Sequence, residues 1–521
     1  MLDRIRIVKT TTVIFAVSIA SKLAQILLFP LIAAYFGTNG ELESFFVAFS
    51  IPMLMLSTLL GSFGMVFIPF FTEQRLKHDD TMVWNFASAL ITVVLLLSSA
   101  ITVLSIICSP WLFSTIAPGM SFHYKELGIV LTRYLSVTIL LFTGTVIFTA
   151  IMNSYQSFIL PAVVGFIANI VIIVPILIVR QKITINIVAA AYVFSAASSA
   201  VILGFSSKAF WQRRYKFILR PHDAQTRQAL GMFLTASCIG ISGQMIPFAN
   251  RYFASFLQEG SIATLEYASR IITFIVELLA VSIVIPLYQK LSNDAAKGDK
   301  ASLAATFTLG IKMIAVVLLP AALFMVLLRE PFFSLLLEHG RFTAQNSIEV
   351  SSAFLFLSLA MIGNGFAQII VSIFYALKRT RLLFALSAGG VIINIALDAL
   401  LYRPLGVNGL ALATGVTAVL GAALAMSFLR KELDGFDRFY MIKFLSKISL
   451  LAFVSSQVAW ITFYFIGHDV RLSHLNLFGK LMISAVICTL TYVILLSYSG
   501  VEEANFVLNR IKERFYNAKK N

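Results

Sequence analysis

Long apolar stretches recur from one end of the chain to the other, and each is long enough to cross a lipid bilayer. A transmembrane helix needs about 20 mostly apolar residues, and about fourteen stretches meet this hydropathy criterion. Membrane β-strands alternate apolar with polar residues, whereas these stretches are apolar throughout. The sequence therefore predicts an all-α integral membrane protein. The predicted spans are approximately 11–36, 42–71, 82–113, 127–152, 157–179, 184–206, 228–256, 265–289, 303–328, 346–377, 381–402, 407–430, 441–466 and 475–499.

The composition excludes several other classes of protein. Of the 521 residues, 59% are hydrophobic and 12% are charged, whereas a soluble domain carries about 25% charged residues. A secreted globular enzyme, a disordered chain and a free nucleic-acid binder are therefore not expected. Cys108, Cys238 and Cys488 all lie inside apolar stretches, so neither a disulfide framework nor a zinc site is indicated.

The basic residues predict how the chain is oriented. Lys and Arg concentrate in alternate connections, and the positive-inside rule places those connections in the cytoplasm. Both termini are then cytoplasmic, which requires an even number of spans. The excess of 40 Lys+Arg over 24 Asp+Glu therefore reflects topology rather than a nucleic-acid partner. The basic connections contain Arg4 to Lys9, Arg75 and Lys77, Lys208 to Arg227, Lys290 to Lys300, Lys378 to Arg381, Arg430 to Lys447, and Arg510 to Lys520.

Short motifs recur at an offset of about 220 residues, which suggests an internal duplication. Phe67-Ile68-Pro69 resembles Val284-Ile285-Pro286, and Tyr155 and Tyr375 each open an inner turn. Because many transporters are built from repeats, we expect two six-helix lobes around a central cavity, followed by two extra C-terminal helices. The predicted divisions are 1–207 for the N-terminal lobe, 208–227 for a basic cytoplasmic linker, 228–430 for the C-terminal lobe, and 431–521 for helices 13 and 14 with a cytoplasmic tail.

Ionisable side chains inside the predicted spans are candidates for a substrate site, since such groups normally face a cavity or a partner. Lys22, Arg251 and Arg270 lie on the first or second helices of the two repeats. Together they would line a cationic cavity suited to an anionic group such as a pyrophosphate. Glu43, at the outer start of the second helix, completes the predicted substrate site. The alternative for Arg270 is an ion pair with Glu266, four residues earlier, that has no further role.

A second group of polar residues suggests an ion site. Asn394 and Asp398 lie four residues apart on one helix, and Asn250 and Thr414 are expected at a similar depth. Oxygen ligands from three helices at one level would coordinate a monovalent cation. The alternative is ordinary hydrogen bonding between helices.

Catalytic motifs are lacking. The six histidines lie in connections without metal-ligand spacing, and no glycine-rich loop precedes a basic residue in the Walker manner. The most distinctive loop segment, His339-Gly340-Arg341-Phe342, is expected to be a turn anchored by its aromatic side chain. We therefore expect a protein that is not an enzyme and has no cofactor. A transporter built from such repeats would then be driven by the membrane potential or by a sodium or proton gradient.

Six short motifs occur in order along most of the chain. They are Phe45 to Pro52, Phe67-Ile68-Pro69, Ala117-Pro118-Gly119, Phe253-Ala254-Ser255, Tyr267 to Arg270, and Gly340 to Thr343. Taken together, they resemble the MurJ-type lipid II flippases of the multidrug/oligosaccharidyl-lipid/polysaccharide exporter superfamily. The resemblance implies a fourteen-helix flippase of the bacterial inner membrane that moves undecaprenyl-pyrophosphate-linked glycans outward by alternating access.

The resemblance also implies roles for individual residues. The essential arginine of the family's eighth helix falls on Arg270, an arginine of its first helix falls on Lys22, and its acid at the start of the second helix falls on Glu43. In members with a sodium site, the ligands fall on the four residues of the predicted ion site.

Some positions depart from the family's pattern. Two further family arginines fall on Leu28 and Leu56, the aspartate usual at position 250 is Asn250, and the proline usual after Arg270 is absent. A cavity without two of its cations should hold a pyrophosphate less firmly, so either the glycan differs or other cations compensate.

We therefore predict a flippase for a lipid II-like peptidoglycan precursor, with a polyprenyl-linked glycan and the bilayer as its partners. It would be a multi-pass protein of the bacterial cytoplasmic membrane, functional as a monomer. One alternative is an exporter of a different lipid-linked oligosaccharide for exopolysaccharide or surface-antigen synthesis. A second alternative is a cation-coupled drug exporter.

Overall fold

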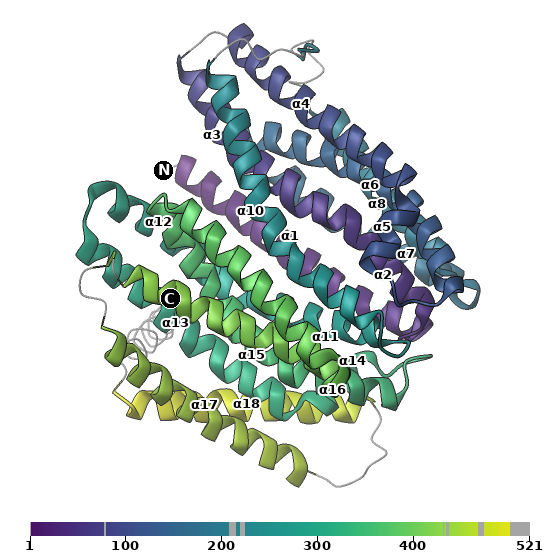
Figure 1. Ribbon diagram of the computed structural model, residues 1–521. Helices are drawn as coiled ribbons and strands as arrows, with labels where there is room; N and C mark the ends of the chain where they lie inside the picture. The colour runs from purple at the N-terminus through teal and green to yellow at the C-terminus, as the bar shows by residue number, and fades with distance from the viewer. Residues whose placement is uncertain are drawn as a thin grey trace. The chain divides into compact units, whose positions relative to one another are not determined.

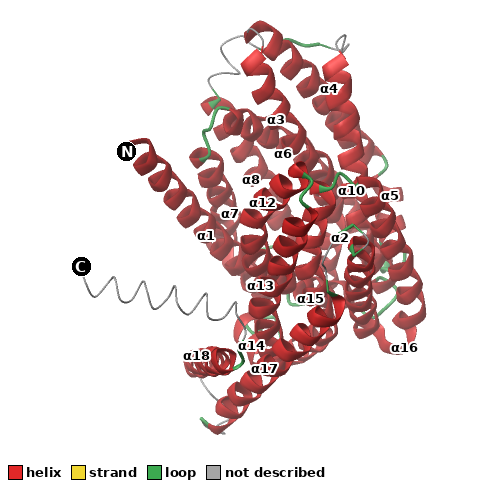
Figure 2. Ribbon diagram, turned by 90° about the vertical axis from the view of Figure 1, so that its left-hand side faces the viewer, coloured by secondary structure: helices red, strands yellow, loops and turns green. Residues whose placement is uncertain are grey.

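The computed structural model describes residues 2–77, 80–207, 215–218, 224–430, 432–433, 437–466 and 474–500. All regular elements among these residues are helices, and no strand occurs among them (Figure 2). The chain separates into two compact units, and each is described below by itself. The first unit comprises Met1–Ala263 with His339–Thr343, and the second comprises Thr264–Glu338 with Ala344–Asn521. The all-α prediction is confirmed.

The first unit contains the helices of the N-terminal half and the first residues of α11 (Figure 1). Their bounds are α1 Leu2–Phe36, α2 Gly40–Met55, η1 Leu56–Leu60, α3 Gly61–Lys77, α4 Asp80–Ile107, α5 Ser109–Ile116, α6 Phe122–Ser154, α7 Ile159–Val179, η2 Arg180–Lys182, α8 Ile185–Ser206 and α10 Ala224–Ala254.

The second unit contains the remaining helices, including most of α11. Their bounds are α11 Ser261–Val276, η3 Glu277–Val281, α12 Ser282–Lys297, α13 Lys300–Leu327, α14 Arg329–Leu337, α15 Ala344–Ala376, α16 Thr380–Leu429, α17 Arg438–Phe465 and α18 His474–Tyr498.

The number of membrane spans agrees with the sequence once α16 is divided. Among the described residues, 13 helices are long and apolar enough to cross a membrane. One of them, α16, has 50 residues and would be about 75 Å long if straight, against a hydrocarbon core of about 30 Å. Its backbone leaves the helical region at Gly406, with φ 57° and ψ −135°. This break separates the two predicted spans 381–402 and 407–430, so fourteen spans result.

One predicted span is interrupted in the structure. The stretch 82–113 was expected to be one helix, but α4 ends at Ile107 and α5 begins at Ser109. Pro110 explains the break, because proline cannot donate to the carbonyl four residues earlier and its ring clashes with that carbonyl. Apolar character alone did not reveal this turn.

Two wide helical turns support the duplication. The π-helical segments η1 and η3 begin at Leu56 and Glu277, 221 positions apart. π-Helical turns are rare and occur frequently at functional sites. Two of them at matching places are therefore a distinctive shared feature of the two halves.

Residues with positive φ recur in the same way. Gln156 and Lys378 follow α6 and α15 with φ of 59° and 57°. Arg180 and Gly406 follow α7 and the first part of α16 with φ of 47° and 57°. Turns of this kind are uncommon outside glycine, so their repetition indicates that equivalent helices end in equivalent ways.

The core of the first unit explains why α10 packs there. Phe63, Phe67 and Phe71 form a stacked row along α3, with ring centroids 5.0 and 5.2 Å apart. Ala229 and Phe233 of α10 are buried in the same cluster, together with residues of α4 and α6. By packing, α10 therefore belongs to the first unit, whereas the sequence division assigns it to the C-terminal lobe. The division into lobes by sequence duplication stays a prediction. The described residues do not include most of the predicted linker 208–227, nor the tail after residue 500.

The loop between α14 and α15 is the predicted aromatic-anchored turn. Phe342 is 2% exposed, and the Arg341 backbone N–H donates to the Ala34 carbonyl at 2.8 Å. Gly340 has φ of +59°, and a Cβ there would lie 2.2 Å from the same carbonyl oxygen. Only glycine fits this close approach, which ties the loop to the last turn of α1.

In the second unit, α17 and α18 lie side by side and are attached to α13 (Figure 1). The Lys312 ammonium donates to the Tyr440 hydroxyl at 3.0 Å and lies 4.7 Å from the centre of that ring. The Tyr492 hydroxyl donates to the Val316 carbonyl at 2.9 Å. Lys312 and Val316 are one turn apart, so a single face of α13 holds both added helices.

Candidate functional site

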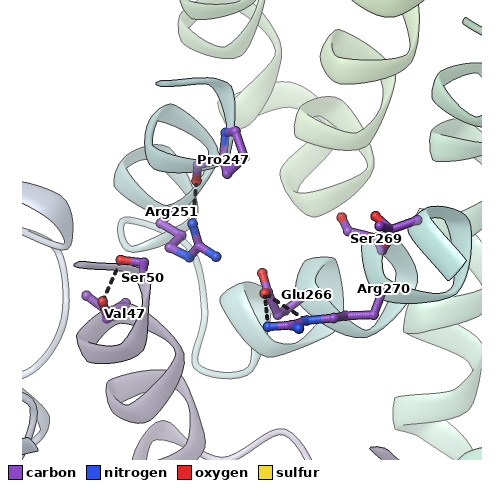
Figure 3. A network of polar contacts seen from close by, with 8 residues as sticks. Val47, Ser50, Pro247, Arg251, Glu266, Ser269 and Arg270 are labelled. Atoms are coloured by element: carbon purple, nitrogen blue, oxygen red, sulfur yellow. Dashed lines mark hydrogen bonds and ion pairs between the residues drawn. The ribbon is translucent and has the colours of Figure 1, made fainter. Parts of the chain in front are cut away.

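Arg270 lies on the accessible face of α11, in the second unit. Its Nε and Nη2 donate to Oε1 of Glu266 at 3.2 and 3.1 Å (Figure 3). The ion pair predicted from the i, i+4 spacing is therefore present. The side chains are 26% and 16% exposed, so the pair is not sealed in the protein interior.

Arg251 and Lys22 belong to the first unit. Arg251, near the end of α10, is half-buried, and its Nη1 donates to the Pro247 carbonyl at 3.2 Å. Figure 3 shows its side chain beside the turn of α2 that carries Ser50. Lys22 is half-buried in the middle of α1. That these two cations line one cavity with Arg270 stays a prediction.

Glu43 has a well-defined structural environment. It is 4% exposed, and its Oε1 accepts from the backbone N–H groups of Ile262 and Ala263 at 2.7 and 3.3 Å. These are first-turn donors of α11, which have no partner within their own helix. The positive end of the helix dipole also favours a carboxylate there. Glu43 therefore acts as an N-terminal cap for a helix more than 200 residues away.

A reciprocal cap, which sequence reasoning missed, lies beside it. Glu259 Oε1 accepts from the Gly40 backbone N–H at 2.7 Å and from the Tyr124 hydroxyl at 2.9 Å. Gly40 begins α2, so Glu259 caps α2 while Glu43 caps α11. Both contacts span 219 positions. The available signal was the acid directly before Gly260, which lies 220 positions after Gly40, at the offset of the predicted duplication.

The predicted ion ligands are divided between the units. Asn394 and Asp398 lie one turn apart on α16 and are 0% exposed. Within the described part of the chain, none of their four side-chain polar atoms has a hydrogen-bond partner. A buried polar group without a partner is unfavourable, so these two residues fit a bound cation with oxygen ligands. Thr414 lies half-buried on the second part of α16, and Asn250 is buried in α10, in the first unit.

Thr417 is a further polar residue of this region that sequence reasoning missed. It is 4% exposed, and its hydroxyl has no partner among the described residues. Its methyl group would lie 3.8 Å from a Cβ at Gly390, one turn before Asn394. Its place three residues after Thr414 was the available signal.

Comparisons with known proteins agree with this architecture. The sequence model of one protein family, described as "Lipid II flippase MurJ", matches residues 32–478. The "Probable lipid II flippase MurJ" of Buchnera aphidicola subsp. Schizaphis graminum is 23% identical over 489 residues, which are 91% of this chain and 93% of that protein. The "Lipid II flippase MurJ" of Burkholderia cenocepacia is 24% identical over 413 residues, covering 77% of this chain and 80% of the relative.

Solved structures share the fold. A structure titled "Lipid II flippase MurJ, inward closed conformation" superposes with a TM-score of 0.78 at 23% identity, covering 94% of this chain and 98% of that one. An inward-facing multidrug resistance transporter of the MATE family, from the MOP superfamily, superposes with a TM-score of 0.67 at 14% identity, covering 81% and 98%. Since the family model matches most of the sequence, the chain belongs to the lipid II flippase MurJ family.

Proposed function

We propose that this chain translocates lipid II, an undecaprenyl-pyrophosphate-linked peptidoglycan precursor, from the cytoplasmic to the outer leaflet by alternating access. The observation that carries the proposal is the family match across residues 32–478. The structure adds Arg270, a cation on an accessible face of a membrane-spanning helix, where charged groups normally serve a water-filled path. The family is named for moving a lipid rather than for catalysis, which supports a transporter and not an enzyme.

In this proposal, the pyrophosphate is bound by Lys22, Arg251 and Arg270. Glu43, on α2, holds the first turn of α11 by accepting its backbone N–H groups. Arginine suits this task because its planar fork matches two phosphate oxygens at once. Glu266 holds the Arg270 fork in place through two nitrogen atoms. A pyrophosphate would compete with Glu266 for that guanidinium.

Growth of a bacterial strain depleted of its own lipid II flippase tests the proposal. The wild-type chain should restore growth, and Arg270→Ala should not, although it inserts into the membrane in the same amount. Arg403→Ala is a matched control, because Arg403 is an exposed cation whose guanidinium donates to its sequence neighbour Tyr402. Full rescue by Arg270→Ala would remove the cationic site. An inserted wild-type chain that fails to rescue would point to a different lipid-linked glycan.

We also propose that a monovalent cation, sodium in the first instance, binds Asn394 and Asp398 with Thr414 and Asn250. The buried, unpartnered oxygens of Asn394 and Asp398 support it. Cation binding to the folded state alone raises stability by mass action. Sodium chloride should therefore raise the unfolding temperature of the purified protein more than choline chloride does, and Asp398→Asn should abolish this difference.

A matched control for the ion site is Asp299→Asn. Asp299 is the N-cap of α13 and accepts from the Ser302 backbone N–H at 2.9 Å. Asparagine caps about as well as aspartate, so this variant should keep the sodium effect. An equal sodium effect in Asp398→Asn and wild type would refute the site, and proton coupling would then be tested by varying pH.

We further propose that the protein resides in the bacterial cytoplasmic membrane with both termini inside and acts as a monomer. The alternation of basic and non-basic connections supports this orientation. Labelling of cysteines introduced at Gln345, in the first turn of α15, and at Lys297, the last residue of α12, would test it, because the predicted topology puts these two helix ends on opposite sides of the membrane.

A further inference from the structure

One face of α11, together with the first residue of η3, carries five accessible polar side chains. They follow the spacing of a single helical face and are Glu266, Ser269, Arg270, Thr273 and Glu277. The half-buried apolar residues Phe274 and Ile275 lie off that face.

The opposite face of α11 is buried and apolar. Tyr267, Ala268, Ile271, Ile272 and Val276 are all 6% exposed or less. A helix that faced lipid on its accessible side would show the reverse pattern, because lipid accepts apolar side chains and excludes charged ones. The polar face of α11 therefore suits contact with water rather than with lipid.

Glu277 lies at the inner end of this polar face. It is exposed, and it is the first residue of the π-helical turn η3. Turns of this type occur frequently at functional sites. The turn therefore supports a functional role for Glu277 independently of the exposure of its side chain. The neighbouring helix α15 contacts η3 and carries Asn364, another exposed polar residue in the middle of a span.

Glu277 and Arg270 are seven residues apart, two turns along one face. At a rise of 1.5 Å per residue, this spacing is about 10 Å along the helix axis. Arg270 is the proposed pyrophosphate ligand, so Glu277 presents an opposite charge at a fixed distance from the phosphate position. A carboxylate at this place would repel a second phosphate and attract an ammonium group.

We propose that Glu277 is a second recognition residue of the substrate site, which binds a primary ammonium group on the lipid-linked headgroup while Arg270 binds its pyrophosphate. This inference rests on the proposed function and narrows its substrate class. The preferred headgroup carries an amine on the order of 10 Å from the pyrophosphate, a distance set by the helix rise. Charge-assisted contacts at both ends would fix the headgroup along the polar face.

Binding of two matched ligands tests the inference. The ligands are a short-chain polyprenyl-pyrophosphate muropeptide precursor with a free amine, and the same preparation after N-acetylation of that amine. The wild-type protein, purified in detergent, should bind the free amine about tenfold more tightly, the value of one charge-assisted hydrogen bond. Glu277→Gln should reduce this preference to less than about twofold, with the affinity for the acetylated ligand kept.

Three further variants make the result specific. Glu349→Gln removes one negative charge from the outer end of α15, where Glu349 accepts from Gln345, and should keep the preference. Glu277→Asp keeps the charge and should retain most of the preference, which separates recognition from folding. Arg270→Ala should weaken both ligands equally.

The outcomes separate the inference from the function on which it rests. A wild-type protein that binds both ligands equally, or a preference that survives Glu277→Gln, would overturn the role of Glu277 and leave lipid II transport standing. A wild-type protein that binds neither ligand, or an Arg270→Ala variant with unchanged affinities, would overturn the proposed pyrophosphate site itself.

Discussion

Replacing Glu43 by alanine should loosen the first turn of α11. The substitution removes the acceptor of two backbone N–H groups, at Ile262 and Ala263, in a place where Glu43 is only 4% exposed. Each buried donor left without a partner costs about 1–3 kcal/mol. Water that enters the space left by the side chain offsets part of this loss, so we expect a total of about 3 kcal/mol. Glu43→Gln keeps an acceptor oxygen but loses the charge at the helix N-terminus, worth about 1 kcal/mol.

Amide hydrogen exchange followed by mass spectrometry measures this effect directly, since exchange reports local opening free energies. Peptides covering the start of α11 should exchange on the order of a hundredfold faster in Glu43→Ala and about fivefold faster in Glu43→Gln. Glu259→Ala is the matched control, because Glu259 is an exposed acid whose bonds go to Gly40 and Tyr124 instead. Unchanged exchange at Ile262 and Ala263 in Glu43→Ala would refute the capping role.

Two stability predictions follow from close contacts. Gly340→Ala should lower the unfolding temperature by the equivalent of about 2 kcal/mol or more, because its Cβ would lie 2.2 Å from the Ala34 carbonyl oxygen. Gly243→Ala, at an open helical position, should instead stabilise by about 0.5–1 kcal/mol, and a similar effect of both changes would contradict this reasoning. Tyr492→Phe should cost about 1 kcal/mol through the lost hydrogen bond to α13. Tyr498→Phe, at an 87% exposed side chain, should have no measurable effect, and thermal unfolding in one detergent compares all four variants.

The helices could be predicted because their signal is local. About 20 apolar residues in a row have few alternatives in a membrane, and most predicted spans match a helix within a few residues. The errors arose where a single residue interrupts an apolar stretch, as Pro110 does between α4 and α5. Hydropathy averages over such a residue and misses the turn. The break at Gly406 falls between the predicted spans 381–402 and 407–430, so hydropathy did predict it.

The candidate sites could be predicted only in part, because side-chain partners depend on packing. The Glu266–Arg270 pair follows from spacing on one helix and was predictable. The bond from the first turn of α11 to Glu43 joins residues 219 positions apart, and no local pattern encodes that contact. Nor does the sequence reveal that Asp398 lacks a hydrogen-bond partner in the described part of the chain. The neighbouring helices decide both how deeply its carboxylate oxygens are buried and which donors reach them.

The two π-helical turns have a consequence for how such a chain tolerates change. A π-helical turn holds one residue more than an α-helical turn, because its backbone hydrogen bonds join residues five apart. The segments η1 and η3 are such wide turns in two otherwise regular membrane helices. Their starts lie 221 positions apart, as the predicted duplication would place them. Deleting one residue from a regular α-helical part would rotate everything beyond it by about 100°, whereas a deletion inside a π-helical turn is absorbed when that turn returns to ordinary pitch. These two turns are therefore the places where the helices can lose a residue without turning a polar face away from water.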